Sequence, residues 1–171
     1  ERETTEGIEL NKVFMVDLMV SPVKKEIILP LIKYDFNKFD LRPESISDLD
    51  NLAEALLDNP EVIIELKSHT DFVGSSLQNK RLSQKRADAC VEYLISKGIK
   101  TEQLVARGMG ENEPFVIEVK DGRFKVGDVL TESYIRKILF RKNREVANQY
   151  NRRTSFKVLI NDSNPLENQK K

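Results

Sequence analysis

Cysteine, histidine and tryptophan are almost missing from this chain of 171 residues, which has one cysteine, one histidine and no tryptophan. A single cysteine excludes an internal disulfide, and one histidine beside it leaves too few soft ligands for a structural zinc site. Excess charge of either sign is missing too, because 28 Lys and Arg residues offset 28 Asp and Glu residues. No global field therefore attracts nucleic acid or an anionic membrane, and a partner must be recognised locally. We expect neither a metal nor a cofactor.

Long apolar runs are absent as well. The run from Ile27 to Ile32 is among the longest and stops after a few positions, whereas a transmembrane helix needs about 20 apolar residues. The chain begins with Glu1 rather than Met and shows no signal-peptide pattern, so we interpret it as a processed chain or an excised fragment. Hydrophobic residues make up 39% of the sequence, which is enough for one core at this length. We expect one domain without a membrane span.

Alternating and β-branched patterns predict strands at 13–20, 26–34, 61–67, 104–106 and 154–160. Pro22 and Pro30 lack the N–H group of a central ladder, so the first of these strands is expected at an edge or outside the main sheet. The polar residues of 1–11 and the composition of 161–171 indicate a linker and a disordered tail. These features divide the chain into a linker remnant with an edge strand (1–25), a domain (26–160) and a tail (161–171).

Apolar residues at three- and four-residue spacing predict helices over 43–59, 83–97 and 131–140. Ser83 and Thr131 are the expected N-caps of the second and third helices, and Gly98 ends the second. Cys90 lies on an apolar stripe and is expected to be a buried, inert thiol. The three residues from Gly108 to Gly110 predict a turn. Strands that alternate with one-sided helices indicate an α/β two-layer sandwich in which helices cover one face of a sheet.

Asp71 and Arg86 are difficult to explain by folding alone. If Ser83 caps its helix, Arg86 lies in the first turn, where a cation opposes the positive end of the helix dipole. The N–H groups of a helix N-terminus and an arginine fork suit a carboxylate, and an aspartate facing them suits an ammonium. The pair thus predicts a receptor for a zwitterion with an amine and a carboxylate on one carbon. The alternative is an internal Asp71–Arg86 ion pair that orients the loop.

Residues at fixed spacing continue across the neighbouring loops and helices: His69-Thr70-Asp71, Gly74, Asn79, Leu82-Ser83, Arg86-Ala87, Tyr93-Leu94, Gly98-Ile99, Gly108, Gly110-Glu111, Pro114 and Asn151-Arg152-Arg153. This set resembles the signature of the OmpA-like peptidoglycan-binding domain over roughly residues 26–160. The resemblance implies a βαβαβ core with helices on one face of a mixed sheet. It also implies noncatalytic binding of the diaminopimelate-containing stem peptide of peptidoglycan in the periplasm. In that family the residue matching Asp71 holds the amine of diaminopimelate, and the residue matching Arg86 holds its carboxylate.

The resemblance implies further ligand-binding residues: Thr70, Asn79, Leu82, Asn37 and Arg152, with Arg153 as the alternative to Arg152. Two departures from the family pattern matter. Ser68 replaces the usual glycine, and we expect its hydroxyl near the ligand. The segment after Pro114 is longer than in the common form, and this insertion, about 115–147, is expected to cover or extend the pocket.

Three segments, Ile28-Leu29-Pro30, Tyr34-Asp35-Phe36 and Leu41-Arg42-Pro43-Glu44-Ser45, resemble a version of the domain found at the C-terminus of large multidomain periplasmic proteins of the Bacteroidota, including a type IX secretion component. That likeness implies an anchor joining an outer-membrane-associated or secretion-system protein to the cell wall. It also implies further domains before Glu1, with other envelope or secretion-system proteins as additional partners.

Other functions have weaker support. Ser68, His69 and Asp71 suggest a catalytic triad, but adjacent side chains of an extended segment point to opposite faces, so we expect a structural histidine and no catalytic residue. Cations over 136–144 give the third helix a positive face, which is usually solvated but is open to nucleic acid, phospholipid or the anionic wall. No aromatic residues interleave these cations in a stacking pattern, so no nucleic acid is expected. Glu111 and Glu113 are expected to face solvent. A protein-interaction module that lost its ligand and, less favoured, a peptidoglycan hydrolase stay open as alternatives.

Overall fold

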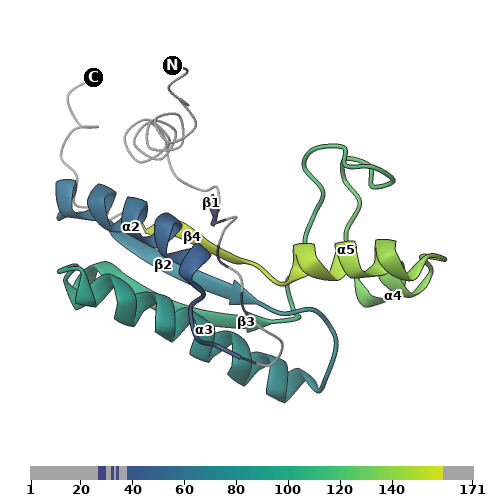
Figure 1. Cartoon of the computed structure of the whole chain (residues 1–171), viewed down its shortest axis with the longest axis horizontal. Coiled ribbons are helices and arrows are strands. Elements are labelled where there is room, and N and C mark those ends of the chain that lie inside the picture. The colour runs from purple at the N-terminus through teal and green to yellow at the C-terminus, as the bar shows by residue number, and fades with distance from the viewer. Residues whose placement is uncertain (1–26, 30–31, 33, 35–37, 160–171) are drawn as a thin grey trace, which may run out of the picture.

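The computed structural model describes residues 27–29, 32, 34 and 38–159. Its elements are β1 (Ile27–Leu29), α2 (Pro43–Asp58), β2 (Ile63–His69), α3 (Ser76–Ser96), a 3-10 helix (Thr101–Gln103), β3 (Leu104–Gly110), α4 (Glu132–Arg136), α5 (Arg141–Asn151) and β4 (Thr154–Leu159), shown in Figure 1. The strand predicted at 13–20, the linker, the tail and Asn37 lie outside the described residues. Within the described residues, no helix is both long enough and apolar enough to span a membrane.

The four strands form a mixed sheet in the order β1-β4-β2-β3. β2 pairs in parallel with β3 and antiparallel with β4, whereas β1 pairs antiparallel with β4 at the edge. A parallel pair needs a crossover connection, and α3 supplies it between β2 and β3. The predicted two-layer α/β fold with helices on a mixed sheet is therefore confirmed.

One hydrophobic cluster joins α2 and α3 to the same face of the sheet. Ile64 and Leu66 of β2 and Leu52 of α2 are fully buried, as are Cys90 and Leu94 of α3. Each large apolar side chain removed from water in this way stabilises the fold by about 1.5–3 kcal/mol. This cluster fixes the end of β2 relative to α3, from which Asp71 and Arg86 project.

The start of α3 differs from the sequence prediction. Ser75 is the N-cap: its hydroxyl accepts from the Gln78 backbone N–H, and the Gln78 side chain accepts from the Ser75 N–H in return. This capping box begins the helix at Ser76. Ser83 lies inside α3, where its Oγ donates to the Lys80 carbonyl at 3.0 Å and accepts from the Gly110 N–H at 2.8 Å. The prediction of Ser83 as N-cap was wrong because the first turns of α3 are polar and carry no apolar period.

β3 also extends further than predicted, because the three residues from Gly108 to Gly110 end the strand instead of forming a separate turn. A Cβ atom on Gly108 would lie 2.1 Å from the backbone nitrogen of Gln84. Glycine at this position therefore lets α3 pack directly against β3.

The segment after Pro114 builds a second, smaller hydrophobic cluster from Ile117, Phe124, Leu130, Ile135, Ile138 and Ala147. Thr131 caps α4 as predicted, with its Oγ1 accepting from the Tyr134 N–H at 3.1 Å. The helix predicted over 131–140 is nevertheless too long, since α4 ends at Arg136 and a separate helix, α5, starts at Arg141. α4 and α5 lie beside the end of the sheet in Figure 1.

Candidate functional site

A cavity of about 570 Å³ opens between the end of β2, the N-terminal half of α3, and α5 with the residue that follows it. Six of the residues that the sequence predicted for ligand binding line it: Thr70, Asp71, Asn79, Leu82, Arg86 and Arg152. The predicted residue Ser68 is not among the lining residues, and Asn37 lies outside the described residues. The fold therefore gathers residues from three distant parts of the chain at one cavity.

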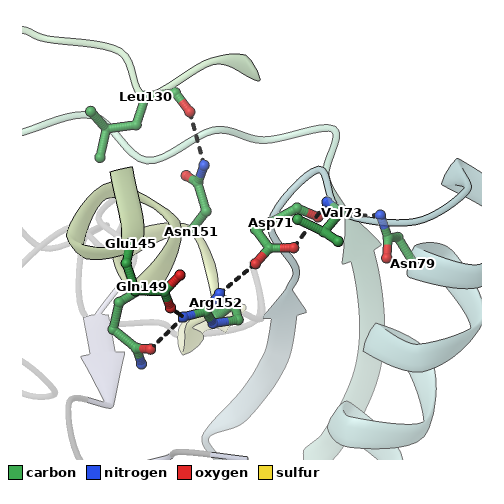
Figure 2. Close-up of polar contacts among 8 residues, drawn as sticks. All are labelled: Asp71, Val73, Asn79, Leu130, Glu145, Gln149, Asn151 and Arg152. Carbon is green, nitrogen blue, oxygen red and sulfur yellow. Dashed lines mark hydrogen bonds and ion pairs between the residues drawn. The ribbon is translucent and has the colours of Figure 1, made fainter. Parts of the chain in front are cut away.

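Asp71 follows β2 directly and is only 7% exposed. Its Oδ1 accepts from the Val73 backbone N–H at 3.0 Å, and its Oδ2 accepts from the Arg152 guanidinium at 2.5 Å (Figure 2). A buried carboxylate needs such partners, because an unpaired charge removed from water is costly. Both oxygens of Asp71 are thus oriented before any ligand arrives.

Arg86 lies in the interior of α3 and is 3% exposed, so its expected place in the first helical turn was wrong. Its Nε donates to the Lys38 carbonyl at 3.0 Å, and its guanidinium lies 4.5 Å from the Tyr34 ring centroid. Burial lowers the pKa of Arg86 from its ordinary value, and the nearby Asp71 charge partly offsets this effect. Because arginine stays charged at physiological pH, the site holds a desolvated cation.

The ion pair that Asp71 forms among the described residues is with Arg152, which differs from the internal Asp71–Arg86 pair considered from the sequence. Arg152 also donates to the Glu145 carboxylate and to Gln149 Oε1 on the preceding turns of α5. Burial opposes its charge, but the bonds to Glu145 and Asp71 outweigh this and raise the pKa of Arg152. Glu145 and Gln149 were missed from the sequence because α5 was not predicted. With α5 in place, their spacing from Arg152 would have put them near its side chain.

Asn79 supports the Asp71 loop from within α3 and is 4% exposed. Its Nδ2 donates to the Asp71 carbonyl at 3.2 Å and to Glu111 Oε2 at 2.5 Å. The expectation that Glu111 only faces solvent was therefore wrong, and this carboxylate ties the loop after β3 to the site.

The Arg153 side chain is directed to the Glu113 backbone rather than to the cavity. The Arg153 guanidinium donates to the Glu113 carbonyl at 3.2 and 3.3 Å, while the Glu113 carboxylate pairs with Lys67 at 3.3 Å. The Glu113 side chain is nevertheless 41% exposed, in line with the expectation that it faces solvent. Of the two neighbouring arginines, Arg152 is the one that lines the cavity.

The expectation that the Ser68 hydroxyl lies near the ligand was also wrong. Its side chain is fully buried, and its Oγ lies 2.8 Å from Thr154 Oγ1 on β4. The hydroxyl therefore joins two strands instead of reaching toward a ligand, since successive side chains of a strand point to opposite faces. His69 is 1% exposed, in line with the expected structural histidine rather than a solvent-accessible base.

The cavity combines charges of both signs. Asp71 and Glu145 contribute carboxylates, and Arg86 and Arg152 contribute guanidinium groups. The lining is neutral in sum but polarised, which suits a small zwitterion better than a simple anion or cation. The fold and this cavity together define a ligand-binding domain on a mixed α/β sheet.

Comparison with known proteins then gives the family. The model of the OmpA family matches residues 33–125, more than half of the chain, and the chain belongs to this noncatalytic family. The chain is 35% identical to the outer membrane porin F of Pseudomonas fluorescens over 95 residues, covering 55% of this chain and 29% of that protein. It is 44% identical to outer membrane protein A of Salmonella typhi over 85 residues, covering 48% of this chain and 24% of that protein. The chain thus spans about a quarter of the length of these relatives.

Solved structures agree on the fold. The peptidoglycan-associated lipoprotein of Burkholderia pseudomallei matches with a TM-score of 0.58 and 22% identity, covering 85% of this chain and 99% of that one. A MotB-like protein of Desulfovibrio vulgaris matches with a TM-score of 0.57 and 18% identity, covering 91% and 93%. At these identities the likeness supports the shared architecture alone.

Proposed function

We propose that the domain binds the diaminopimelate-containing stem peptide of peptidoglycan without cleaving it. The observation that carries this proposal is the placement of Asp71 and Arg86, both buried, at one cavity of an OmpA-family domain. The zwitterionic end of diaminopimelate carries an ammonium for Asp71 and a carboxylate for Arg86. Lysine at the same place in the stem peptide offers an amine without the adjacent carboxylate, so the ligand presents no carboxylate to Arg86.

The contacts within the cavity suggest how the ligand enters. Asp71 already has a cationic partner in Arg152, so the ligand ammonium either displaces that guanidinium or shares the carboxylate with it. Glu145 and Gln149 continue to hold Arg152 when Asp71 turns to the ligand. Thr70, Asn79 and Leu82 complete the proposed wall on this side, and Asn37 stays a prediction.

We further propose that the domain anchors an envelope protein to the cell wall in the periplasm, associated with the outer membrane through the rest of the protein. The names of the relatives, an outer membrane porin and outer membrane protein A, support this location. The finer assignment, to a Bacteroidota type IX secretion component similar to PorE, stays a prediction from the sequence. The coding sequence upstream of Glu1 tests it, because further periplasmic domains are expected there.

Binding to purified sacculi tests the proposal directly. We expect the chain to sediment with diaminopimelate-type sacculi at low and moderate salt, but only weakly with lysine-type sacculi. Asp71→Asn and Arg86→Lys should each weaken binding by a factor of ten or more, about 1.4 kcal/mol or greater. Asp71→Asn leaves the ligand ammonium without a carboxylate, and Arg86→Lys keeps the charge but removes the two-pronged geometry that a carboxylate prefers. Asp58→Asn and Arg81→Lys are matched controls at exposed helix positions and should bind like the unmodified chain.

The alternatives give different results in the same assay. Absence of sedimentation with either wall type would reject ligand binding and favour a protein-interaction module. Release of soluble fragments from sacculi would reveal a hydrolase. Unchanged affinity of both site variants, with their folds intact, would remove Asp71 and Arg86 from the binding site.

A further inference from the structure

The turn between α4 and α5 carries two large apolar side chains that project into water. Leu139 is 80% exposed and Phe140 is 65% exposed. The turn is nevertheless anchored, because the neighbouring Ile138 is 2% exposed within the second hydrophobic cluster. The Phe140 carbonyl also accepts from the Asn143 and Arg144 N–H groups at 3.0 and 3.2 Å. The two apolar side chains thus belong to a fixed feature of the fold.

Cations surround this apolar pair. The sequence from 136 to 144 is Arg-Lys-Ile-Leu-Phe-Arg-Lys-Asn-Arg and contains no acidic residue. Arg136 is occupied by its ion pair with Glu132 and by the ring of Phe72. The other four cations are exposed, and within the part of the chain that the structure describes none of them forms an ion pair. We call Lys137, Leu139, Phe140, Arg141, Lys142 and Arg144 the basic tip.

Folding does not account for the basic tip. α5 has no acidic residue in its first turn, and Arg141, Lys142 and Arg144 lie at the positive end of its dipole. Cations at that end destabilise a helix, and exposed leucine and phenylalanine side chains gain nothing from burial. Cations at the wrong end of a helix dipole and exposed apolar side chains therefore occur together on one turn. This coincidence points to a partner that neutralises the cations and covers the apolar side chains.

We propose that the basic tip docks on an anionic phospholipid surface. Leu139 and Phe140 would enter the boundary between headgroups and acyl chains, and the four cations would contact lipid phosphates. A nucleic acid or an anionic glycan satisfies the cations but provides no apolar medium for the leucine. The chain is neutral overall, so the attraction is confined to this turn and orients the domain on the membrane.

The basic tip and the ligand cavity use opposite ends of α5. Gln149 and Arg152 reach the cavity from the C-terminal end of α5 and Glu145 reaches it from the middle of the helix, whereas the tip lies at its start (Figure 1). With 11 residues in α5, the two ends are about 16 Å apart. Membrane docking and ligand binding are therefore compatible, and each can be tested without the other.

Vesicle flotation with the whole chain tests the docking surface. We expect the chain to float with vesicles containing phosphatidylglycerol but not with vesicles of phosphatidylcholine alone. Leu139→Ser/Phe140→Ser should lower the partition coefficient about tenfold or more, because the apolar contribution is lost. Arg141→Gln/Lys142→Gln should also weaken partitioning and reduce its dependence on salt. Sacculus binding by these variants should not change.

Matched controls lie in the same insertion. Val119→Ser/Val126→Ser removes two exposed apolar side chains, at 77% and 65% exposure, and Lys120→Gln/Lys125→Gln removes two exposed cations. Neither pair belongs to the basic tip, so both controls should float like the unmodified chain. Circular dichroism confirms that each variant is folded.

A fluorescence measurement distinguishes insertion from simple charge attraction. The chain has no tryptophan, so Phe140→Trp introduces a single reporter, whose emission should shift to shorter wavelength on phosphatidylglycerol vesicles. Three results would each overturn the proposal: no flotation with either vesicle, flotation that survives Leu139→Ser/Phe140→Ser, or stronger binding to heparin or DNA than to vesicles with no emission shift on the vesicles.

Discussion

Both carboxylate oxygens of Asp71 accept a hydrogen bond, but the two donors come from different parts of the chain. The Val73 N–H belongs to the same loop, whereas Arg152 comes from the end of α5, far away in the sequence. The hydrogen bond from Val73 orients the carboxylate within its own loop, and the Arg152 guanidinium neutralises its charge. Asp71 is therefore a structural ion-pair partner and a proposed ligand group at once, and the two roles can be separated by changing Arg152 alone.

Arg152→Gln should destabilise the domain by about 1–3 kcal/mol, because it leaves the buried Asp71 carboxylate without its cation. Adding Asp71→Asn to this variant should recover part of the loss, since the uncompensated charge is then gone. Urea unfolding of the two single variants and the double variant measures the coupling. Additive losses would show that the pair contributes no net stability, and Arg81→Gln on the exposed face of α3 is the control.

Burial of Cys90 predicts the direction in which the stability of the domain changes with pH. The thiol is fully buried, with Tyr34 Oη 3.3 Å from its sulfur, and burial raises the pKa of Cys90 from 9.0 to about 11. Above pH 9 the unfolded chain loses this proton while the folded chain keeps it. Stability from Cys90 is therefore complete below pH 9 and should fall by about 1.4 kcal/mol per pH unit up to pH 11.

Denaturant unfolding between pH 8 and 11 tests this expectation against Cys90→Ala, whose stability should fall less steeply over the same range. Only the slopes are compared, because the smaller side chain also leaves a cavity. At pH 8 the thiol of the folded protein should resist a thiol reagent and react only as the chain unfolds. Equal slopes, or rapid labelling of the folded protein, would contradict the buried thiol.

At the scale of elements, β2, β4 and the first helix were predictable from the sequence, because each has an apolar period that matches its burial, whereas only the start of β3 was predicted. Ile64 and Leu66 of β2 and Leu49 and Leu56 of α2 show this directly. The start of α3 and the whole of α5 were not predictable in the same way. Their ends are fixed by polar contacts, and α5 buries only a narrow stripe that includes Ala147.

The same distinction applies to the site. The sequence singled out Asp71 and Arg86 by their charges and Asn79 by the family resemblance, and all three line the cavity. It also placed Arg86 in the wrong part of its helix and put the Ser68 hydroxyl near the ligand. The first error came from an assumed start of the helix, which local pattern fixes poorly. The second came from the position of Ser68 in the family pattern, which does not give the direction of its side chain.

The capping box of α3 gives a prediction at this scale. Ser75→Ala removes the hydroxyl that accepts from the Gln78 N–H and should cost about 1 kcal/mol of stability. Ser76, one position later and also exposed, makes no such capping contact, so Ser76→Ala should be nearly neutral. Thermal or urea unfolding compares the two variants, and an equal loss in both would argue against Ser75 as the cap.

At the scale of the whole molecule, the described residues form two separate hydrophobic clusters of unequal size. The larger cluster supports β2 and α3, which carry Asp71 and Arg86, and the smaller one supports α4 and α5. The Asp71–Arg152 ion pair connects the two sides (Figure 2). Within the smaller cluster's part of the chain, Asn151 ties α5 to the segment before α4. Its side chain donates to the Leu130 carbonyl at 2.8 Å and accepts from the Phe115 N–H at 2.8 Å.

Because the smaller cluster buries fewer apolar side chains, the α4–α5 unit should open more often than the main core. Amide hydrogen exchange in α5 should therefore be faster than in β2 and the centre of α3. A ligand that contacts both sides of the cavity binds only the closed arrangement and so should slow exchange in α5. A diaminopimelate-containing muropeptide at saturating concentration should produce this protection in the unmodified chain and not in Asp71→Asn. Exchange in α5 as slow as in β2 without ligand would show that the domain opens as one cooperative unit.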